Sequence, residues 1–427
     1  MTFVTGNTST TIDAILKEYY DDGALVNETY IDNPLWARMS KAEALGNVTG
    51  RHFVHPVVIA TSQGRSRSFT QAQSRGQATN EMAYDFLVPR VTNYQLATVS
   101  TQAVLQTKGD RGAFIDILTL ATDDAVRNLG LAQAHSMYGN GGEAIGQIGT
   151  IGGTSNSVIT FAQADQCLNF EVQMELDAAS DDGSTGSTTV AAYGTNAHGL
   201  YVIAVDRTAN TITVGTAAGV ACAVTDATDG IPTAADGYYL FGRGDKGLGM
   251  QGIQAWIPYG GPSSGDSFLG VTRTVDPQRL AGNWLDASSL AVEDAFITAS
   301  QVVAKAGGKL THFFVPFTKY AQLLKSQSAK VTIIEEVNPD ISFDGLQVLT
   351  PKGPVLVIPD RNCPSNRMFG LNIDTWTYTH VGDPVQMFNL DGNTWLRQAT
   401  ADGLEIRFFS MGNLVCRVPA HNITMAC

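Results

Sequence analysis

The segment from residue 53 to residue 106 constrains the fold most, because its pattern predicts a long ribbon of two extended arms. The outgoing arm spans residues 53–60, and the return arm, rich in Val, Thr, Tyr and Leu, spans about residues 82–105. At about 3.3 Å per residue the return arm would reach about 65 Å, and an isolated two-stranded hairpin is only marginally stable in water. The ribbon therefore needs a second surface, which we expect to belong to a neighbouring copy of the chain. This pattern indicates assembly rather than catalysis.

The tip that joins the two arms is polar and carries the charges of the ribbon. Gly64 and Gly76 are expected to be turn residues, because glycine adopts the backbone conformations that turns require. The charged residues of the tip are Arg65, Arg67 and Arg75. The sequence predicts that these arginines meet an acidic surface, and the alternative is that they are only solvated.

The distribution of charge favours the docking interpretation. The chain has 427 residues and a net charge of −13, but residues 51–107 contain five arginines and only two acidic residues. Residues 151–260, in contrast, contain three basic and eleven acidic residues. A basic ribbon on an acidic protein suits docking onto another copy of that protein. No domain-wide basic patch is present, so sequence-specific nucleic-acid recognition is not expected.

The rest of the chain changes character three times. Residues 110–138 show the periodicity of one helix of about 28 residues, which would be about 42 Å long. From residue 151 to about 250, Gly, Ala, Ser, Thr and Asp dominate and short strand signals recur, which indicates a small all-β module or barrel. The last third is predicted to be α+β. The helices are expected at residues 288–306 and 318–326, and the strands at residues 310–315, 346–349, 355–358, 368–373, 394–397, 404–410 and 414–418.

The first fifty residues are predicted to be an arm. Ile12, Ile15 and Leu16 fall on one stripe of a short amphipathic helix. Pro34 is expected to stop any helix, and Trp36 is expected to anchor the arm. There is neither a run of about eighteen apolar residues nor a visible secretory signal, and the five cysteines are scattered and expected to be reduced.

Motifs that carry chemistry are weak or missing. The glycine pattern of residues 242–247 matches a dinucleotide-binding fingerprint, but the glycine-rich residues that follow cannot form the required helix. His52 and His55 are spaced like metal ligands without a third ligand nearby. No nucleophile elbow, zinc-protease motif or phosphate-binding loop occurs. We therefore expect no catalytic residue, no cofactor and no metal, and the chain is not expected to be an enzyme.

Several stretches of the last third, taken in order, resemble one family. They are residues 311–316 (THFFVP), 343–348 (FDGLQV), 353–364 (GPVLVIPDRNCP), 367–371 (RMFGL), 391–395 (DGNTW) and 402–407 (DGLEIR). With the arm, ribbon and long helix before them, they are similar to the major capsid proteins of tailed bacteriophages, which have the Hong Kong 97-like fold. The order of the segments carries this resemblance more than any single motif.

The resemblance implies an α+β capsid fold with an inserted all-β domain. Its expected divisions are an N-terminal arm (1–50), an extended loop (51–107), a spine helix of a peripheral domain (108–150), the inserted domain (151–260), an axial domain (261–390) and closing strands of the peripheral domain (391–427). It also implies a virion protein, assembled in the host bacterial cytoplasm without a membrane. Copies would form hexamers and pentamers around double-stranded DNA, with a scaffolding protein, a portal and a decoration protein as partners. The residues expected to contact a neighbouring subunit are Arg65, Arg67, Phe69, Arg75 and Trp36.

One property of some family members is not expected here. Those members crosslink a lysine of the extended loop to a neighbour, but residues 51–107 contain no lysine. Two alternatives stay open: an encapsulin-like compartment of the same fold that houses a cargo enzyme, and a carbohydrate-binding protein or enzyme that uses the all-β module. The second alternative requires a convergent set of polar groups, which the sequence does not reveal.

Overall fold

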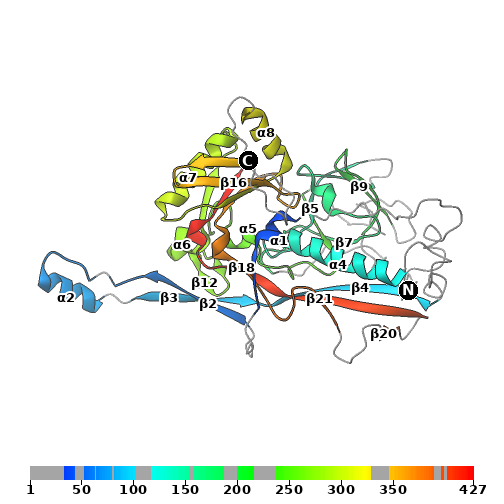
Figure 1. Cartoon of the computed structure of the whole chain (residues 1–427), viewed down its shortest axis with the longest axis horizontal. Helices are drawn as coiled ribbons and strands as arrows, with labels where there is room; N and C mark the ends of the chain where they lie inside the picture. Colours follow the sequence, from blue (N-terminus) through cyan, green and yellow to red (C-terminus); the bar gives the residue numbers. More distant parts are fainter. Residues whose placement is uncertain are drawn as a thin grey trace.

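The computed structural model contains two six-stranded sheets and a closed barrel, and a hairpin projects from them (Figure 1). It describes residues 33–43, 52–62, 64–78, 81–101, 117–152, 157–186, 200–215, 237–327, 346–388, 396–398 and 402–427. The predicted helix at residues 12–19 and the predicted strand start at residue 394 lie outside these ranges.

The ribbon is an antiparallel pair of strands with a helix at its far end. Strands β2 (His52–Ala60) and β3 (Met82–Pro89) pair along their length, and helix α2 (Phe69–Ala78) lies at the tip (Figure 1). The prediction that Gly76 is a turn residue was wrong, because Gly76 lies inside α2, whereas Gly64 lies in the irregular segment before it. The alanine, glutamines and arginine around Gly76 favour a helix strongly enough to tolerate one glycine, which costs about 1 kcal/mol.

The predicted return arm is two strands that belong to different sheets. After β3 the chain continues as β4 (Val91–Ser100), which pairs with β21 (Gly403–Cys416) rather than with β2. Strand β21 also corrects a prediction, because the two strands expected at residues 404–410 and 414–418 are one strand of 14 residues. Gly412 lies inside this strand, although glycine is common in turns. A Cβ at this position would lie 2.6 Å from the ring of Tyr378 on a neighbouring strand, so the glycine leaves room for that ring.

A first six-stranded sheet carries the long helix. Its order is β1 (Ser40–Glu43), β18 (Trp376–His380), β21 and β19 (Gln386–Met387), with β4 and β20 (Leu396–Arg397) also paired to β21. Helix α4 (Ile117–Ser136) packs on it through Ala125 and Leu129, which contact Ile406 and Phe408. The helix predicted over residues 110–138 thus ends close to its expected place, and its expected start is outside the described residues.

A second six-stranded sheet forms the other half of the body. Its order is β13 (Asn283–Asp286), β22 (Ile423–Ala426), β17 (Arg367–Leu371), β14 (His312–Val315), β16 (Gly353–Pro359) and β15 (Leu346–Thr350). Helices α7 (Val292–Lys305) and α8 (Phe317–Gln327) lie on it (Figure 1). Both sheets contain strands from before and after residue 391, where a domain boundary is expected, and that boundary stays a prediction. Strand β18 belongs to the first sheet, whereas β22 fills the gap between β13 and β17 in the second.

Between the helix α4 and the second sheet the chain folds into a closed six-stranded barrel. Its order is β10 (Tyr239–Gly242), β5 (Gly146–Gly152), β6 (Val158–Phe161), β9 (Thr211–Gly215), β8 (Leu200–Asp206) and β7 (Glu175–Ala179). The interior is apolar and contains Ile148, Phe170 and Leu240, all fully buried. Five of these strands fall in the segment whose composition indicated an all-β module, whereas β5 begins five residues before the expected start at residue 151.

Short elements complete the core between the two sheets. Helix α1 (Pro34–Arg38) begins at Pro34. The expectation that this proline stops a preceding helix stays a prediction, because the residues before 33 lie outside the described ranges. Proline is well tolerated in the first turn of a helix, where its missing N–H has no intrahelical partner. The remaining short elements are α5 (Ile253–Trp256), α6 (Pro277–Ala281), β11 (Ser267–Phe268), β12 (Val271–Thr272) and four 3₁₀ turns. Within the described ranges, no helix has the length and apolar character needed to span a membrane.

Candidate assembly surface

One face of the ribbon is covered by the chain's own body. Ile59, Phe86 and Val88 alternate with exposed residues along β2 and β3 and are buried. The ring of Phe86 lies 5.1 Å from that of Trp256, and the backbone N–H of Leu87 donates to the carbonyl of Leu269 at 2.9 Å. The base of the ribbon is therefore fixed in position within a single subunit.

A buried arginine holds the aromatic platform under the ribbon. The guanidinium of Arg273 lies 4.1 Å from the ring centre of Phe268, which packs at right angles on Trp256. Its Nε donates to Asp266 at 2.6 Å and its Nη1 donates to the carbonyl of Ala255 at 2.7 Å. Because the charge is paired and hydrogen-bonded, its burial is compatible with a stable core.

The opposite face of the ribbon is largely apolar, with Asp85 as its one charged residue among those described, and it is largely exposed in the described chain. Val54 and Val58 on β2 are 59% and 60% exposed, and Leu87 on β3 is 41% exposed. Val54 lies directly across from Leu87 in the ladder, and Val58 lies across from Ala83. A strand pair that is apolar on both faces is expected to be covered on both faces. The sequence already indicated two apolar faces, because valines occur at both even-numbered and odd-numbered positions of the outgoing arm.

The tip brings together four of the five residues predicted to contact a neighbour. Phe69, the first residue of α2, is 82% exposed, and Arg65, Arg67 and Arg75 are exposed as well. Nη1 of Arg75 donates to the backbone carbonyl of Arg65 at 3.4 Å, which links α2 to the segment before it. The tip thus combines one large apolar side chain with three cations.

Trp36, the fifth predicted residue, lies on α1 and away from the tip. Its ring packs edge-on against Tyr378 at 5.0 Å, and the Lys41 ammonium lies 4.7 Å from its centre. Trp36 is partly buried against the core between the two sheets. These contacts are with its own chain, and a contact of Trp36 with a neighbour stays a prediction.

A second exposed apolar strip was missed by the sequence analysis. On the face of the first sheet opposite α4, Tyr94 and Leu96 of β4 are 60% and 51% exposed. The ring of Tyr94 lies 6.3 Å from that of Phe409 on β21, which also contacts Phe388 at 6.0 Å. The alternation of Tyr94 and Leu96 with polar residues was the available signal, but it does not reveal which face is covered.

The side chains of the ribbon face and the tip are mostly not those that bind metal ions. In the part of the chain that the structure describes, no three His, Cys, Asp or Glu side chains gather in a way that could hold a metal ion. The exposed ribbon face and tip instead present apolar and cationic groups, which are the groups that bury or pair on contact with another macromolecule.

Solved structures with the same arrangement identify the fold. The capsid of cyanophage A-1(L) matches with a TM-score of 0.51 at 12% sequence identity, over 95% of this chain and 96% of that chain. The chain has the fold of a phage capsid protein. The resemblance that the sequence indicates is thereby confirmed at the level of the fold.

Two further solved structures align with nearly the whole of this chain at lower TM-scores. A protein of Mycobacterium phage Ogopogo has a TM-score of 0.45 at 9% identity, over 98% of this chain and 99% of that chain. The capsid of Myoviridae phage XM1 has a TM-score of 0.44 at 8% identity, with 96% of each chain covered. No family model matches the chain, and no curated protein matches it in sequence.

Proposed function

We propose that this chain is the major capsid protein of a tailed bacteriophage, a structural subunit rather than an enzyme. Copies would assemble as hexamers and pentamers into an icosahedral shell that encloses double-stranded DNA. The observation that carries the proposal is the ribbon, which is apolar on both faces although only one face is covered within its own subunit. The near-full-length capsid fold supports the same role.

The energetics of the ribbon favour contact with another copy. Full burial of a Val, Leu or Phe side chain contributes about 1.5–3 kcal/mol. Val54, Val58, Leu87 and Phe69 remain largely exposed in one subunit, so their burial by a neighbour would contribute several kcal/mol per ribbon. That gain recurs at every subunit of a closed shell, which makes large, obligate interfaces the expected outcome.

Charge would orient this contact. The three arginines of the tip belong to a protein with a net charge of −13, so a neighbouring copy offers acidic surface for them to pair with. The acidic surface also disfavours tight binding of the enclosed DNA, because phosphate contacts require basic groups. A scaffolding protein, a portal and a decoration protein are the further partners that we propose, with assembly in the host cytoplasm and the virion as the final location.

Electron microscopy of the expressed chain, alone and with its scaffolding protein, tests this proposal. The wild type is expected to form closed shells or capsomers. The double variant Val54→Asp and Val58→Asp is expected to stay folded but unassembled, since it places charges on the uncovered face. Asp85→Asn, which changes a polar residue on the same exposed face, is the matched control and should assemble normally. A wild-type chain that stays monomeric at high concentration, with its ribbon resistant to protease, would contradict the proposal.

A further inference from the structure

A groove of about 340 Å³ lies beside the start of β4, and we call it the β4 groove. It is lined by the first residues of β4, by the end of α4 and by residues between 245 and 250, which lead from the barrel to α5. Two of its lining residues, Tyr94 and Leu248, are 60% and 59% exposed. Exposed apolar side chains around a concave surface are typical of a site for another macromolecule.

The charge of the β4 groove is negative. Glu143 and Asp245 line it, and no lysine or arginine does so among the described residues. Asp245 is exposed, and its carboxylate has no hydrogen bond or ion pair within the described ranges. Burial and the nearby charge of Asp177 raise the pKa of Asp245, as is usual where acidic groups crowd without a cation. The groove therefore favours a positively charged partner.

The cations closest to Asp245 in sequence are bonded to other carboxylates. Nη1 of Arg243 lies 2.8 Å from Glu175, and Nζ of Lys246 lies 2.7 Å from Asp181. Lys246 is also almost completely buried, so it cannot turn outward to the groove without leaving the core. The carboxylate of Asp245 is thus left for a cation from outside the subunit.

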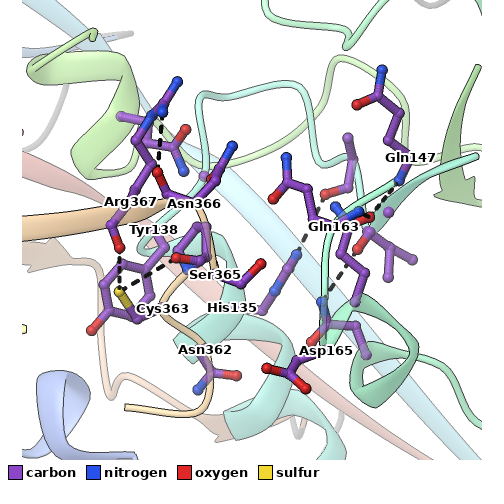
Figure 2. A pocket seen from close by; sticks show the side chains of 18 of the residues that line it. His135, Tyr138, Gln147, Gln163, Asp165, Asn362, Cys363, Ser365, Asn366 and Arg367 are labelled. Atoms are coloured by element: carbon purple, nitrogen blue, oxygen red, sulfur yellow. Dashed lines mark hydrogen bonds between the residues drawn. The ribbon is translucent and has the colours of Figure 1, made fainter. Parts of the chain in front are cut away.

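Two other cavities are lined by cations and do not share this charge. A polar cavity of about 430 Å³ lies beside the barrel, and Figure 2 shows Gln163 on one side of it and Arg367 on the other. Arg361 lines the same cavity. Another cavity, close to the base of the ribbon, is lined by Arg279 and Lys305. A cationic partner is therefore better matched to the β4 groove than to either of these.

The ribbon tip carries the groups that match the groove. Phe69 is 82% exposed, more than any other large apolar side chain of the described residues. Arg67, two residues before it, is exposed and has no bonded partner among the described residues. In Figure 1, α2 lies at the end of the ribbon that is far from β4 and the barrel. The tip of a subunit therefore does not meet that subunit's own groove, but it can meet the groove of another copy.

We propose that the ribbon tip of a neighbouring copy docks in the β4 groove, with Phe69 against Leu248 and the Arg67 guanidinium on the Asp245 carboxylate. Burial of the two apolar side chains supplies affinity, and the ion pair fixes the orientation. The inference rests on the proposed capsid function, because it requires a neighbouring subunit. It adds to that function the surface that receives the ribbon.

Charge exchange tests the ion pair in full-length protein expressed with its scaffolding protein, with shell yield measured by sedimentation. Arg67→Glu and Asp245→Lys should each reduce the yield about tenfold, because each places like charges together. The two substitutions combined should restore the yield to within about twofold of the wild type, since they recreate an ion pair. Glu171→Lys is the matched control and should assemble normally, because Glu171 lies on the barrel surface outside the groove and pairs there with Arg207.

Cysteine crosslinking tests the contact independently of charge. Shells that carry Phe69→Cys and Leu248→Cys, treated with a short bismaleimide, should give linked oligomers on a denaturing gel. In dilute, unassembled subunits the same variant should give no oligomers, and Leu248→Cys should react freely with a maleimide. Phe69→Cys combined with Val172→Cys is the control, because Val172 is also apolar and 52% exposed but does not line the groove. The wild-type chain gives the background from its native thiols.

The docking site is overturned if shells form but the Phe69 and Leu248 pair gives no linked oligomers, or if the Val172 control is linked equally well. It is also overturned if the combined charge variant assembles no better than the single ones. A Leu248→Cys thiol that is already protected in unassembled subunits would show that the chain's own residues fill the groove, which excludes the tip. These results leave the capsid function standing, whereas a wild-type chain that forms no shells overturns both.

Discussion

The side-chain Oδ1 of Asn422 accepts a hydrogen bond from the indole Nε1 of Trp376 at 2.8 Å, in a fully buried seam between the two six-stranded sheets. The same oxygen accepts from the backbone N–H of Asn372 at 2.8 Å. The Nδ2 of Asn422 donates to Thr375 Oγ1 and to the carbonyl of Val418, both at 3.0 Å. One asparagine thus satisfies polar groups that the connections between β17 and β18 and between β21 and β22 would otherwise leave buried and unpaired.

Asn422→Leu keeps the branched shape of this side chain but removes its hydrogen bonds. Each buried group left without a partner costs about 1–3 kcal/mol, so the free energy of unfolding should fall by about 3 kcal/mol or more. Chemical denaturation measures the change. Asn366→Ala is the control, since the amide of Asn366 has no partner among the described residues, and it should change stability by less than about 0.5 kcal/mol. Equal effects of the two substitutions would contradict this account of the seam.

Substitutions of two phenylalanines of the ribbon should distinguish an effect on subunit stability from an effect on assembly. Phe86 is fully buried against Trp256 and Phe268, whereas Phe69 at the tip is 82% exposed. Phe86→Ala should lower the free energy of unfolding by about 3–5 kcal/mol, because it leaves a cavity under the ribbon. Phe69→Ala should leave the subunit as stable as the wild type but reduce the yield of shells. Denaturation and sedimentation measure the two effects, and a loss of subunit stability in Phe69→Ala would show that the tip packs on its own chain.

Two glycines of the tip should respond in opposite ways to the same substitution. A Cβ on Gly64 would lie 3.0 Å from the Cα of Gly76, whereas a Cβ on Gly76 would meet its nearest atom at 3.9 Å. Gly76→Ala should therefore stabilise α2 by about 0.5–1 kcal/mol, since glycine is unfavourable inside a helix. Gly64→Ala should push the helix away from the segment before it. Limited proteolysis of the tip is the measurement: cleavage should slow in Gly76→Ala and accelerate in Gly64→Ala, and the reverse order would refute the packing.

The elements that the sequence predicts well are those whose own periodicity determines them. The predicted helix at residues 288–306 contains α7, and the predicted strand at 310–315 contains β14, because each has a regular apolar pattern. Helix α1 was missed because Pro34 has opposite effects at the start and in the interior of a helix. The position of β22 depends on the gap between β13 and β17, which no local pattern encodes.

The candidate sites also differ in whether a local sequence pattern is enough to predict them. The tip arginines are neighbours in sequence, so composition alone was sufficient to group them. The exposed face of the ribbon could not be predicted, because it depends on which set of alternate residues the body covers. That set is chosen by Trp256 and Phe268, which lie more than 150 residues later in the chain.

Glu143 gives the fold a dependence on pH. Its carboxyl accepts a hydrogen bond from Ser136 Oγ and lies against Gly249, where an added Cβ would be 2.5 Å from Oε2. Burial raises the pKa of Glu143 to about 7, the Ser136 hydrogen bond opposes that rise, and the nearby charge of Asp245 adds to it. The pKa of Asp245 is raised as well, by burial and by Asp177. The folded state therefore favours the protonated carboxyl.

The sign of the pH effect follows from the difference between the pKa of Glu143 in the folded chain and its pKa in the unfolded chain. A carboxyl whose pKa is higher in the folded state contributes its stability fully below about pH 4.5, its unfolded value, and loses it as the pH rises through about 7. The loss should be about 3 kcal/mol, at 1.36 kcal/mol per pKa unit. Glu143→Gln should remove most of this loss, so that its urea midpoint at pH 8 exceeds that of the wild type. Glu171→Gln, on the exposed barrel surface, should follow the wild-type profile, and a Glu143→Gln profile that also follows it would exclude this carboxyl as the cause.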